Sequence, residues 1–245
     1  IAIAGGVSAQ GFPSKPIRLV VPFAPGGVVD ITARQIGPKL SEALGQPVLI
    51  ENRSGAGGTL AADHVAKSVP DGHTLFIAFD SHAVNPHIYK SDLRYDTFKD
   101  LAPISFVGSI PLLLATSPAF PAKDISSFIQ VAKSKPGTIS YASVGAGSSG
   151  HLAAEQLKLL ANVDMLHIPF KGDAASLQEL LAGRLDFATS IAASAAAQVK
   201  AGTVRLLAVA SERRHPGFPD VPTLRELGID VTQLSFAGIF DPKGT

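Results

Sequence analysis

The sequence predicts an α/β protein of two Rossmann-like domains joined by crossing strands. Apolar runs of strand length alternate with segments of helical periodicity from residue 17 to residue 210. Glycine-rich turns follow predicted strands in both halves of the chain, at 25–27 and again at 145–150. The apolar run 104–116 contains Gly108 and Pro111, and a strand of this length with these residues is typical of a segment that passes between domains.

The crossing segments divide the chain. We expect domain 1 to comprise 13–106 and 236–245, and domain 2 to comprise 107–235. The chain would cross at about 106–114 and again at 234–240, and two crossing strands form a hinge. The glycine-rich turns would then face each other across a cleft.

In the first half of the chain, each predicted helix follows a predicted strand after a short turn. Strands are expected at 17–22, 47–51 and 74–79, and helices at 30–44 and 59–68. Right-handed crossovers bring the carboxyl ends of such parallel strands to one edge of the sheet. The three turns that follow the strands, the last of them a polar turn at 80–83, are therefore expected at that edge.

The second half repeats the pattern. Helices are expected at 124–134, 151–160, 174–182 and 192–200, and strands at 138–143, 165–170, 186–190 and 204–210. A further helix is expected from Val221–Thr223 to Leu227, and a last strand at 236–240 would return to domain 1.

Composition excludes several functions. The 245 residues include 21 basic and 20 acidic ones, and no basic run supports nucleic-acid binding. Without cysteine the chain has no thiol catalysis, no cysteine-based metal site and no disulfide. Neither a His-Glu-x-x-His nor a G-x-S-x-G motif occurs. We therefore expect no catalytic residue, no metal and no cofactor.

The N-terminus indicates export. Residues 1–12 are interpreted as a signal-peptide remnant or a disordered N-terminus, because 1–10 carry no charge and Val7–Ala9 matches a small-residue cleavage site. No later apolar run has the length that spans a bilayer.

The turn after the first strand is predicted to hold an anion. Phe23–Gly27 leaves backbone N–H groups without intrahelical partners at the start of a helix, and the helix dipole adds positive potential there. Asp30 is expected to cap this turn and hold its N–H groups in place. Phe23 would cover the apolar body of a ligand.

The turn Gly145–Gly150 matches G-x-G-x-x-G, with Asp173 following the next strand near the place of a ribose-binding acid. A nucleotide-binding oxidoreductase is therefore one alternative. The hydroxyls of Ser148 and Ser149 instead suit a carboxylate. His82 and His151 lie in predicted cleft turns, and His151 would either line the cleft or hydrogen bond to the backbone of its own turn.

Several blocks in one order carry a family resemblance from Pro13 to Gly244. They are Val21–Gly27 with Asp30, Glu51–Gly58, Pro70–Leu75, His82–Pro86, His167–Gly172, Leu181–Asp186 and Pro219–Thr223. The chain resembles the periplasmic solute-binding receptors of tripartite tricarboxylate transporters, the Bug proteins.

The resemblance implies a two-lobed, type II-like periplasmic binding protein fold without catalytic activity. The protein would be a periplasmic monomer that captures a small carboxylate in the interdomain cleft and delivers it to a membrane transporter. Domain 1 would contact one end of the ligand, partly through ordered water, and domain 2 would grip the other carboxylate. The expected ligand-binding residues are Phe23, Ala24, Pro25, Gly26, Gly27, Asp30, Ala56, Gly57, Ser81, His82, Ser148, Ser149, His151, Lys171, Gly172, Asp173, Thr189 and Ser190.

Three positions depart from the family pattern. Gly150 stands where a hydroxyl residue often precedes the histidine, Phe170 where tyrosine is usual, and Ser190 where many relatives have an acid. Without that acid a ligand ammonium would lose its counter-charge, which favours a plain dicarboxylate, aliphatic or aromatic, over an amino acid. The family's C-terminal helices would follow Thr245, so that domain 1 would be incomplete in this chain. An exported sensor that passes its ligand signal to a membrane kinase is a second alternative.

Overall fold

The computed structural model describes residues 11–170 and 172–245, which form two compact units. Unit 1 contains the described residues up to Ala78 together with Leu93–Ser105 and Ile239–Thr245, and unit 2 contains Phe79–Asp92 and Phe106–Gly238. Residues 79–92, which the sequence division assigned to domain 1, thus pack with unit 2. Residues 1–10, on which the signal-peptide interpretation mainly rests, lie outside the described residues. The predicted site residue Lys171 lies outside them as well.

Unit 1 is built around the central strand β1. Its elements are β1 (Ile17–Val21), α1 (Val28–Leu44), β2 (Val48–Asn52), the 3₁₀ turn η1 (Ala56–Gly58), α2 (Thr59–Ala66) and β3 (Thr74–Phe79). Strand β1 pairs in parallel with both β2 and β3. The carboxyl ends of these strands therefore lie at one edge, as predicted.

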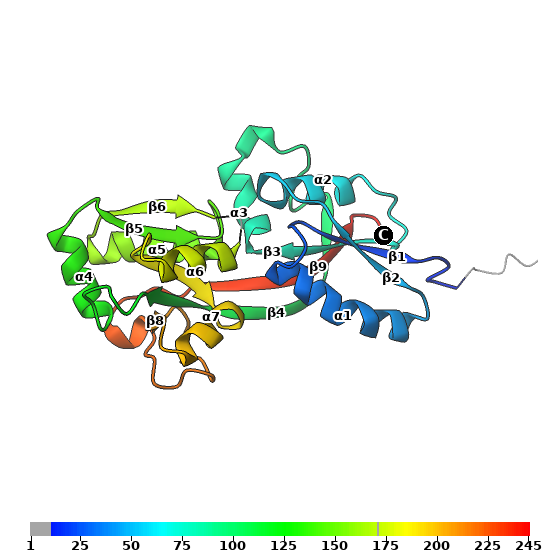
Figure 1. The fold of residues 1–245 in the computed structure, drawn as a ribbon. Coiled ribbons are helices and arrows are strands. Elements are labelled where there is room, and N and C mark those ends of the chain that lie inside the picture. The colour runs from blue at the N-terminus through cyan, green and yellow to red at the C-terminus, as the bar shows by residue number, and fades with distance from the viewer. Residues whose placement is uncertain (1–10, 171) are drawn as a thin grey trace, which may run out of the picture. The chain divides into compact units, whose positions relative to one another are not determined.

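Helices cover the two faces of these strands, with α2 above them and α1 below them in Figure 1. Beneath α2, Val20 of β1 and Phe76 of β3 pack with Ala61, Ala62 and Val65 in one buried cluster. The small residues of α2 let the helix approach the sheet closely, and the turn between β1 and α1 starts from this rigid base.

Two long strands pass through both units. Strand β4 (Leu101–Thr116) begins in unit 1 and continues in unit 2, and β9 (Leu234–Pro242) ends in unit 1. They include the segments that the sequence predicted as crossings. Both Gly108 and Pro111 lie inside β4 and are half-buried, directly after its exposed stretch 103–107.

Unit 2 contains a mixed sheet. Its elements are α3 (Asp80–Ile88), η2 (Lys90–Asp92), α4 (Ile125–Ser134), β5 (Ile139–Ser143), α5 (Ser149–Ala161), β6 (Met165–Pro169), α6 (Asp173–Leu181), β7 (Phe187–Ile191), α7 (Ala192–Lys200), β8 (Arg205–Val209) and η3 (Arg225–Leu227). Strand β5 is parallel to β6 and β7, whereas β4 is antiparallel to β7 and β8. The α/β class with this strand-turn-helix alternation confirms the predicted fold class.

Three local predictions were wrong. The expected polar turn at 80–83 is the start of helix α3, which contains Pro86 and has little apolar periodicity. The expected helix up to Leu227 is only the 3₁₀ turn η3, which Gly228 ends in the left-handed conformation. Ser149 and Gly150, expected in a turn, form the first turn of α5.

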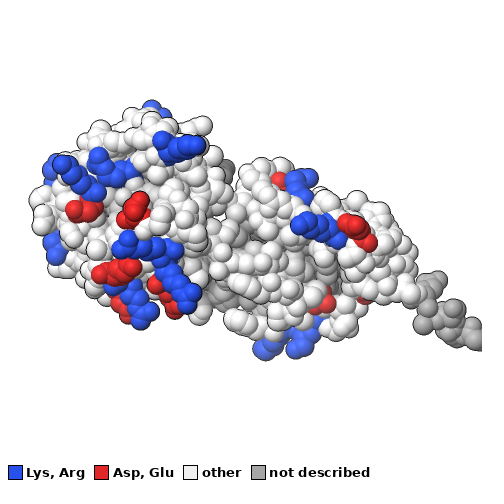
Figure 2. Space-filling model, turned by 90° about the horizontal axis from the view of Figure 1, so that it is seen from below, with Lys and Arg blue, Asp and Glu red and all other residues white. Residues whose placement is uncertain are grey.

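The surface has no single-sign field on the face shown in Figure 2, where basic and acidic side chains are interspersed. This distribution agrees with the net charge of +1. Within the described part of the chain, no helix has both the length and the apolar character to span a membrane.

Candidate functional site

The turn between β1 and α1 is held from inside by Asp30. One carboxylate oxygen, Oδ2, accepts the Gly26 N–H at 2.9 Å and the Arg34 Nε–H at 2.9 Å. The other oxygen accepts from Asn52 at 2.9 Å, and the same amide group donates to the Phe23 carbonyl at 3.0 Å. Asp30 thus ties the turn to its own helix and to the end of β2, as expected for a capping residue.

The electrostatics of this turn are dominated by Arg34. Its hydrogen bond, with those from Gly26 and Asn52, lowers the pKa of Asp30 to about 2, although burial opposes the charged form. Asp30 is only 2% exposed, whereas Ala24, Pro25 and Gly26 are exposed. The turn itself is therefore open to a ligand, and the carboxylate that shapes it is not.

Ala56 and Gly57 lie in η1, directly after β2. Both have positive φ, 46° for Ala56 and 63° for Gly57. Because β1 and β2 are parallel and Asn52 bonds to the Phe23 carbonyl, η1 starts at the same edge of the sheet as the Phe23–Gly27 turn.

The turn between β5 and α5 is rigid. Ser148 is the N-cap of α5: its hydroxyl oxygen accepts the His151 N–H at 3.3 Å and its hydroxyl donates to the Gly145 carbonyl at 2.7 Å. His151 Nδ1 accepts the Gly147 N–H at 3.1 Å. This bond matches the second role considered for His151, that of holding its own turn.

Two glycines of this turn are required by close packing. Gly147 has φ +78°, and a Cβ there would lie 2.2 Å from Cδ1 of Ile88 in α3. At Gly150 a Cβ would lie 2.3 Å from the Thr189 hydroxyl oxygen of β7. These contacts account for Gly147 and Gly150 without a nucleotide.

Helix α3 brings a carboxylate to the start of α5. The Ser149 N–H donates to Asp80 Oδ2 at 2.6 Å, and Asp80 is only 6% exposed. Burial raises the pKa of Asp80, although the hydrogen bonds from Ser149 oppose this change. His82 on the same helix is 5% exposed, and burial lowers its pKa to about 4, so its ring is neutral at neutral pH.

A second buried carboxylate joins α6 to β7. Asp173, the first residue of α6 after Gly172, accepts the Ser190 hydroxyl at 2.8 Å and the Ile191 N–H at 3.2 Å through Oδ2. Burial raises the pKa of Asp173, with Ser190 the main opposing donor. An acid is therefore present beside position 190, although it comes from another element.

Aromatic rings pack beneath the β5–α5 turn. His167 lies between His151 and Tyr141, with ring centroids 4.1 Å and 4.8 Å away. Burial lowers the pKa of His167 to about 4, and Ser143 Oγ lies 2.7 Å from its Nε2. A neutral stack of this kind supports the turn without adding charge.

The predicted residues thus form two groups. In unit 1, Asp30 and Asn52 bring the Phe23–Gly27 turn to the end of β2, where η1 follows. In unit 2, the α3, α5 and β7 residues are linked through Asp80–Ser149 and Gly150–Thr189, and Asp173 contacts Ser190. Sequence reasoning missed Asp80, Asn52, Tyr141 and His167. Position alone could have identified Asp80, since it directly follows a buried strand.

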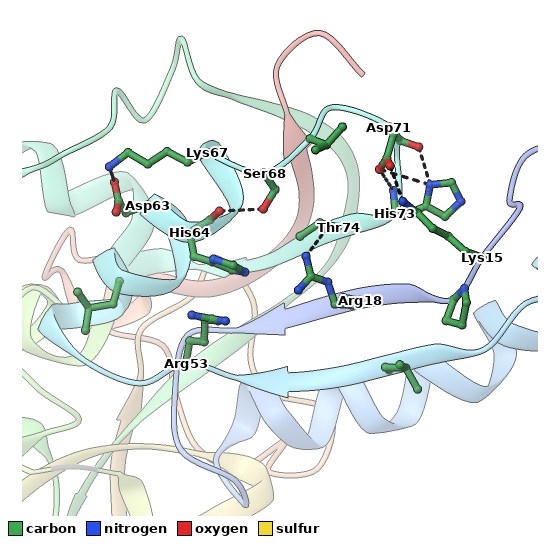
Figure 3. Close-up of a pocket in the computed structure, with 14 residues that line it drawn as sticks. Lys15, Arg18, Arg53, Asp63, His64, Lys67, Ser68, Asp71, His73 and Thr74 are labelled. Carbon is green, nitrogen blue, oxygen red and sulfur yellow. Dashed lines mark hydrogen bonds and ion pairs between the residues drawn. The ribbon is translucent and has the colours of Figure 1, made fainter.

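A hollow of about 920 Å³ lies elsewhere in unit 1, between β1, β2 and the outer side of α2. Figure 3 shows that most charges in it are already paired: Lys15 with Asp71 at 2.8 Å, Lys67 with Asp63, and Arg18 with Thr74 at 3.0 Å. It contains none of the predicted site residues, and we do not assign the ligand site to it.

Comparison with known proteins gives a consistent result. The model of the family described as "tripartite tricarboxylate transporter family receptor" matches residues 32–245. Protein BugT of Bordetella pertussis is 36% identical over 246 residues, which cover 99% of this chain and 75% of the relative.

Solved structures agree in fold. A Rhodopseudomonas palustris protein, Rpa4515 with adipate, has 34% identity and a TM-score of 0.89, with 96% of this chain and 79% of that chain covered. MatC from the same organism, with bound malate, has 37% identity and a TM-score of 0.85, with 96% and 80% covered.

Proposed function

Because the chain belongs to the tripartite tricarboxylate transporter receptor family, we propose that it is a periplasmic receptor for a small dicarboxylate, aliphatic or aromatic, which it delivers to a membrane transporter. Members of this family are solute-binding receptors and not enzymes. The two similar structures with adipate and malate support the dicarboxylate class.

One observation carries the choice of a carboxylate. The first amide of α5 already holds a carboxylate, that of Asp80, at 2.6 Å. The start of α5 therefore presents a donor of the kind that a carboxylate needs, although Asp80 occupies it in this structure, and the helix dipole adds favourable potential. We place one ligand carboxylate there, beside Ser148 and Ser149.

Energetics require further contacts. An anion at a helix start gains at most about 2 kcal/mol when partly buried, whereas micromolar affinity needs about 8 kcal/mol. In unit 1, the turn Phe23–Gly27 has an exposed backbone at Ala24, Pro25 and Gly26, and Asp30 already binds its Gly26 amide.

The experiment is a binding panel on the full chain. Adipate, malate, succinate and an aromatic dicarboxylate are tested by thermal shift and calorimetry, with NAD(H) as the counter-probe. A ligand at 100 times its Kd should add about 2.7 kcal/mol to the free energy of unfolding. Binding of NAD(H) without binding of any dicarboxylate would support the oxidoreductase instead.

Two variants locate the carboxylate. Ser149→Pro removes the amide donor at a position where helices accept proline, and Ser148 already has the extended backbone that precedes proline (ψ 157°). This variant should lose binding, and because it also removes the amide partner of the buried Asp80 carboxylate, its folding is verified by circular dichroism before binding is measured. Ser149→Ala keeps the amide and should retain most of the affinity. Equal affinity in both variants would show that the ligand binds elsewhere.

A further inference from the structure

Asp80 stands at an unusual place in unit 2. It is the first residue of α3, and its carboxylate reaches the first amide of a different helix, α5. The side chain is more than nine-tenths buried, so this contact is part of the packed structure and not a surface pairing.

The helix cap of α5 is complete without Asp80. Ser148 serves as N-cap and accepts the His151 N–H, which is the third amide of the helix. The Ser149 N–H is the first amide, which the Ser148 side chain does not bind. Asp80 thus occupies a donor that the cap leaves available.

We propose that the Asp80 carboxylate takes the place at the start of α5 that a ligand carboxylate would take, and that the ligand binds there by displacing it. Asp80 is then the residue that sets the affinity of this end of the site. The inference rests on the proposed function, because it presupposes a carboxylate ligand at Ser149.

Physical chemistry makes the two states exclusive. One N–H group cannot serve two carboxylates, and two like charges in a buried space repel each other. The apparent affinity equals the intrinsic affinity multiplied by the fraction of molecules in which Asp80 has left the Ser149 amide.

Burial disfavours the charged form of Asp80, which competes with the ligand carboxylate for the Ser149 amide. Its hydrogen-bond partner in the structure is the neutral Ser149 amide, and burial raises the pKa of its carboxyl above the ordinary value. As the pH falls, Asp80 becomes neutral before an ordinary aspartate does. The competition should therefore diminish at lower pH.

Two substitutions test the proposal on the full chain. Asp80→Asn keeps an acceptor for the Ser149 amide and drops the charge, and it is the variant expected to preserve the fold. Asp80→Ala removes the acceptor as well. Asp124→Asn is the matched control, since Asp124 is an exposed N-cap that accepts the Ser127 N–H at 2.7 Å at the start of α4 in the same unit.

Calorimetry with adipate and malate gives the readout at pH 7.5 and pH 5.5. Both Asp80 variants should bind more tightly than the wild type at pH 7.5, by about tenfold for alanine and less for asparagine. The ratio of variant to wild-type affinity should shrink as the pH is lowered, because the raised pKa of Asp80 makes its carboxyl neutral earlier than an ordinary aspartate. The control should match the wild type at both pH values.

The outcomes separate the two claims. If the wild type binds a dicarboxylate and the Asp80 variants bind it equally or more weakly, Asp80 is a structural link between α3 and α5, and the competition proposal is wrong. If neither the wild type nor any variant binds the panel, the proposed function itself fails.

Discussion

In the turn after β1, the Gly26 amide donates to Asp30, which lies four residues further along in the helix that follows the turn. In the turn after β5, the Ser149 amide donates to Asp80, which belongs to another helix, α3. Asp30 is surrounded by Arg34 and Asn52 and has a pKa of about 2, whereas Asp80 is held by neutral groups and its pKa is raised. The first carboxylate is a permanent part of its turn, and the second has a weaker hold on its charged state.

The difference teaches how to assign roles to buried acids. Both aspartates lie at a strand-turn-helix junction and both bind a backbone amide, so residue type and place do not distinguish them. The charge of the neighbours does. A cation beside the acid stabilises its charged form, whereas burial among neutral donors raises its pKa, and on our proposal the second kind of acid is the one that another anion can displace. Substitutions in both turns probe this comparison.

The largest effect is expected in the β5–α5 turn. Gly150→Ala should lower the free energy of unfolding by about 3 kcal/mol, because the new methyl group would overlap the buried Thr189 hydroxyl. Thr189→Ala in the same chain should restore most of this loss. Urea denaturation of both single variants and the double variant measures the coupling, and additive effects would show that the two positions do not share space.

In the turn after β1, Asp30→Asn should cost about 2 kcal/mol at neutral pH, since it removes the charge that Arg34 and the Gly26 amide stabilise. The native pKa lies below the ordinary one, so the wild-type contribution is complete above pH 3.8 and is lost as the pH falls toward about 2. Hydrogen exchange of the Gly26 amide across this range gives the measurement.

Asp71→Asn is the matched control for that titration. Burial does not protect Asp71, which pairs with Lys15 at 2.8 Å and has a side chain 32% exposed. Its pKa is also about 2, through Lys15 and the His73 amide, but water screens the pair. A cost equal to that of Asp30→Asn would contradict the distinction between buried and exposed acids.

The smallest effect concerns the ring stack below the β5–α5 turn. Because burial keeps His167 neutral and lowers its pKa from 6.5 to about 4, its contribution is complete above pH 6.5 and is lost as the pH falls toward 4. Protection of the Gly147 amide should fall by about 1 kcal/mol in this window after allowance for solvent screening. His167→Gln should flatten the slope, and the exposed His87→Gln should not.

Sequence reasoning reached the strand-turn-helix order because the strands carry continuous apolar runs. Strand β3 and helix α7 have the predicted bounds, and the two crossing segments are strands. Helix α3 was missed because its polar residues and Pro86 give no apolar stripe. A short polar helix of this kind is stabilised by contacts with neighbouring elements, whereas its sequence alone predicts only a turn.

Within the candidate site, sequence identified the turns but not their partners. Asp30 was assigned its capping role because its amide partner lies four residues away. The contacts of Ser149 with Asp80 and of Gly150 with Thr189 join residues far apart in the chain. Such pairs follow from packing in three dimensions, and no local sequence pattern predicts them. The ligand-binding role of the predicted site residues stays a prediction.

The contact between Asp173 and Ser190 limits which side chains position 190 can carry. The Ser190 hydroxyl lies 2.8 Å from the Asp173 carboxylate, so an acid at position 190 would place two carboxyl groups together, and they would compete for one proton. The buried Asp173 carboxylate therefore favours a neutral hydrogen-bond donor at position 190.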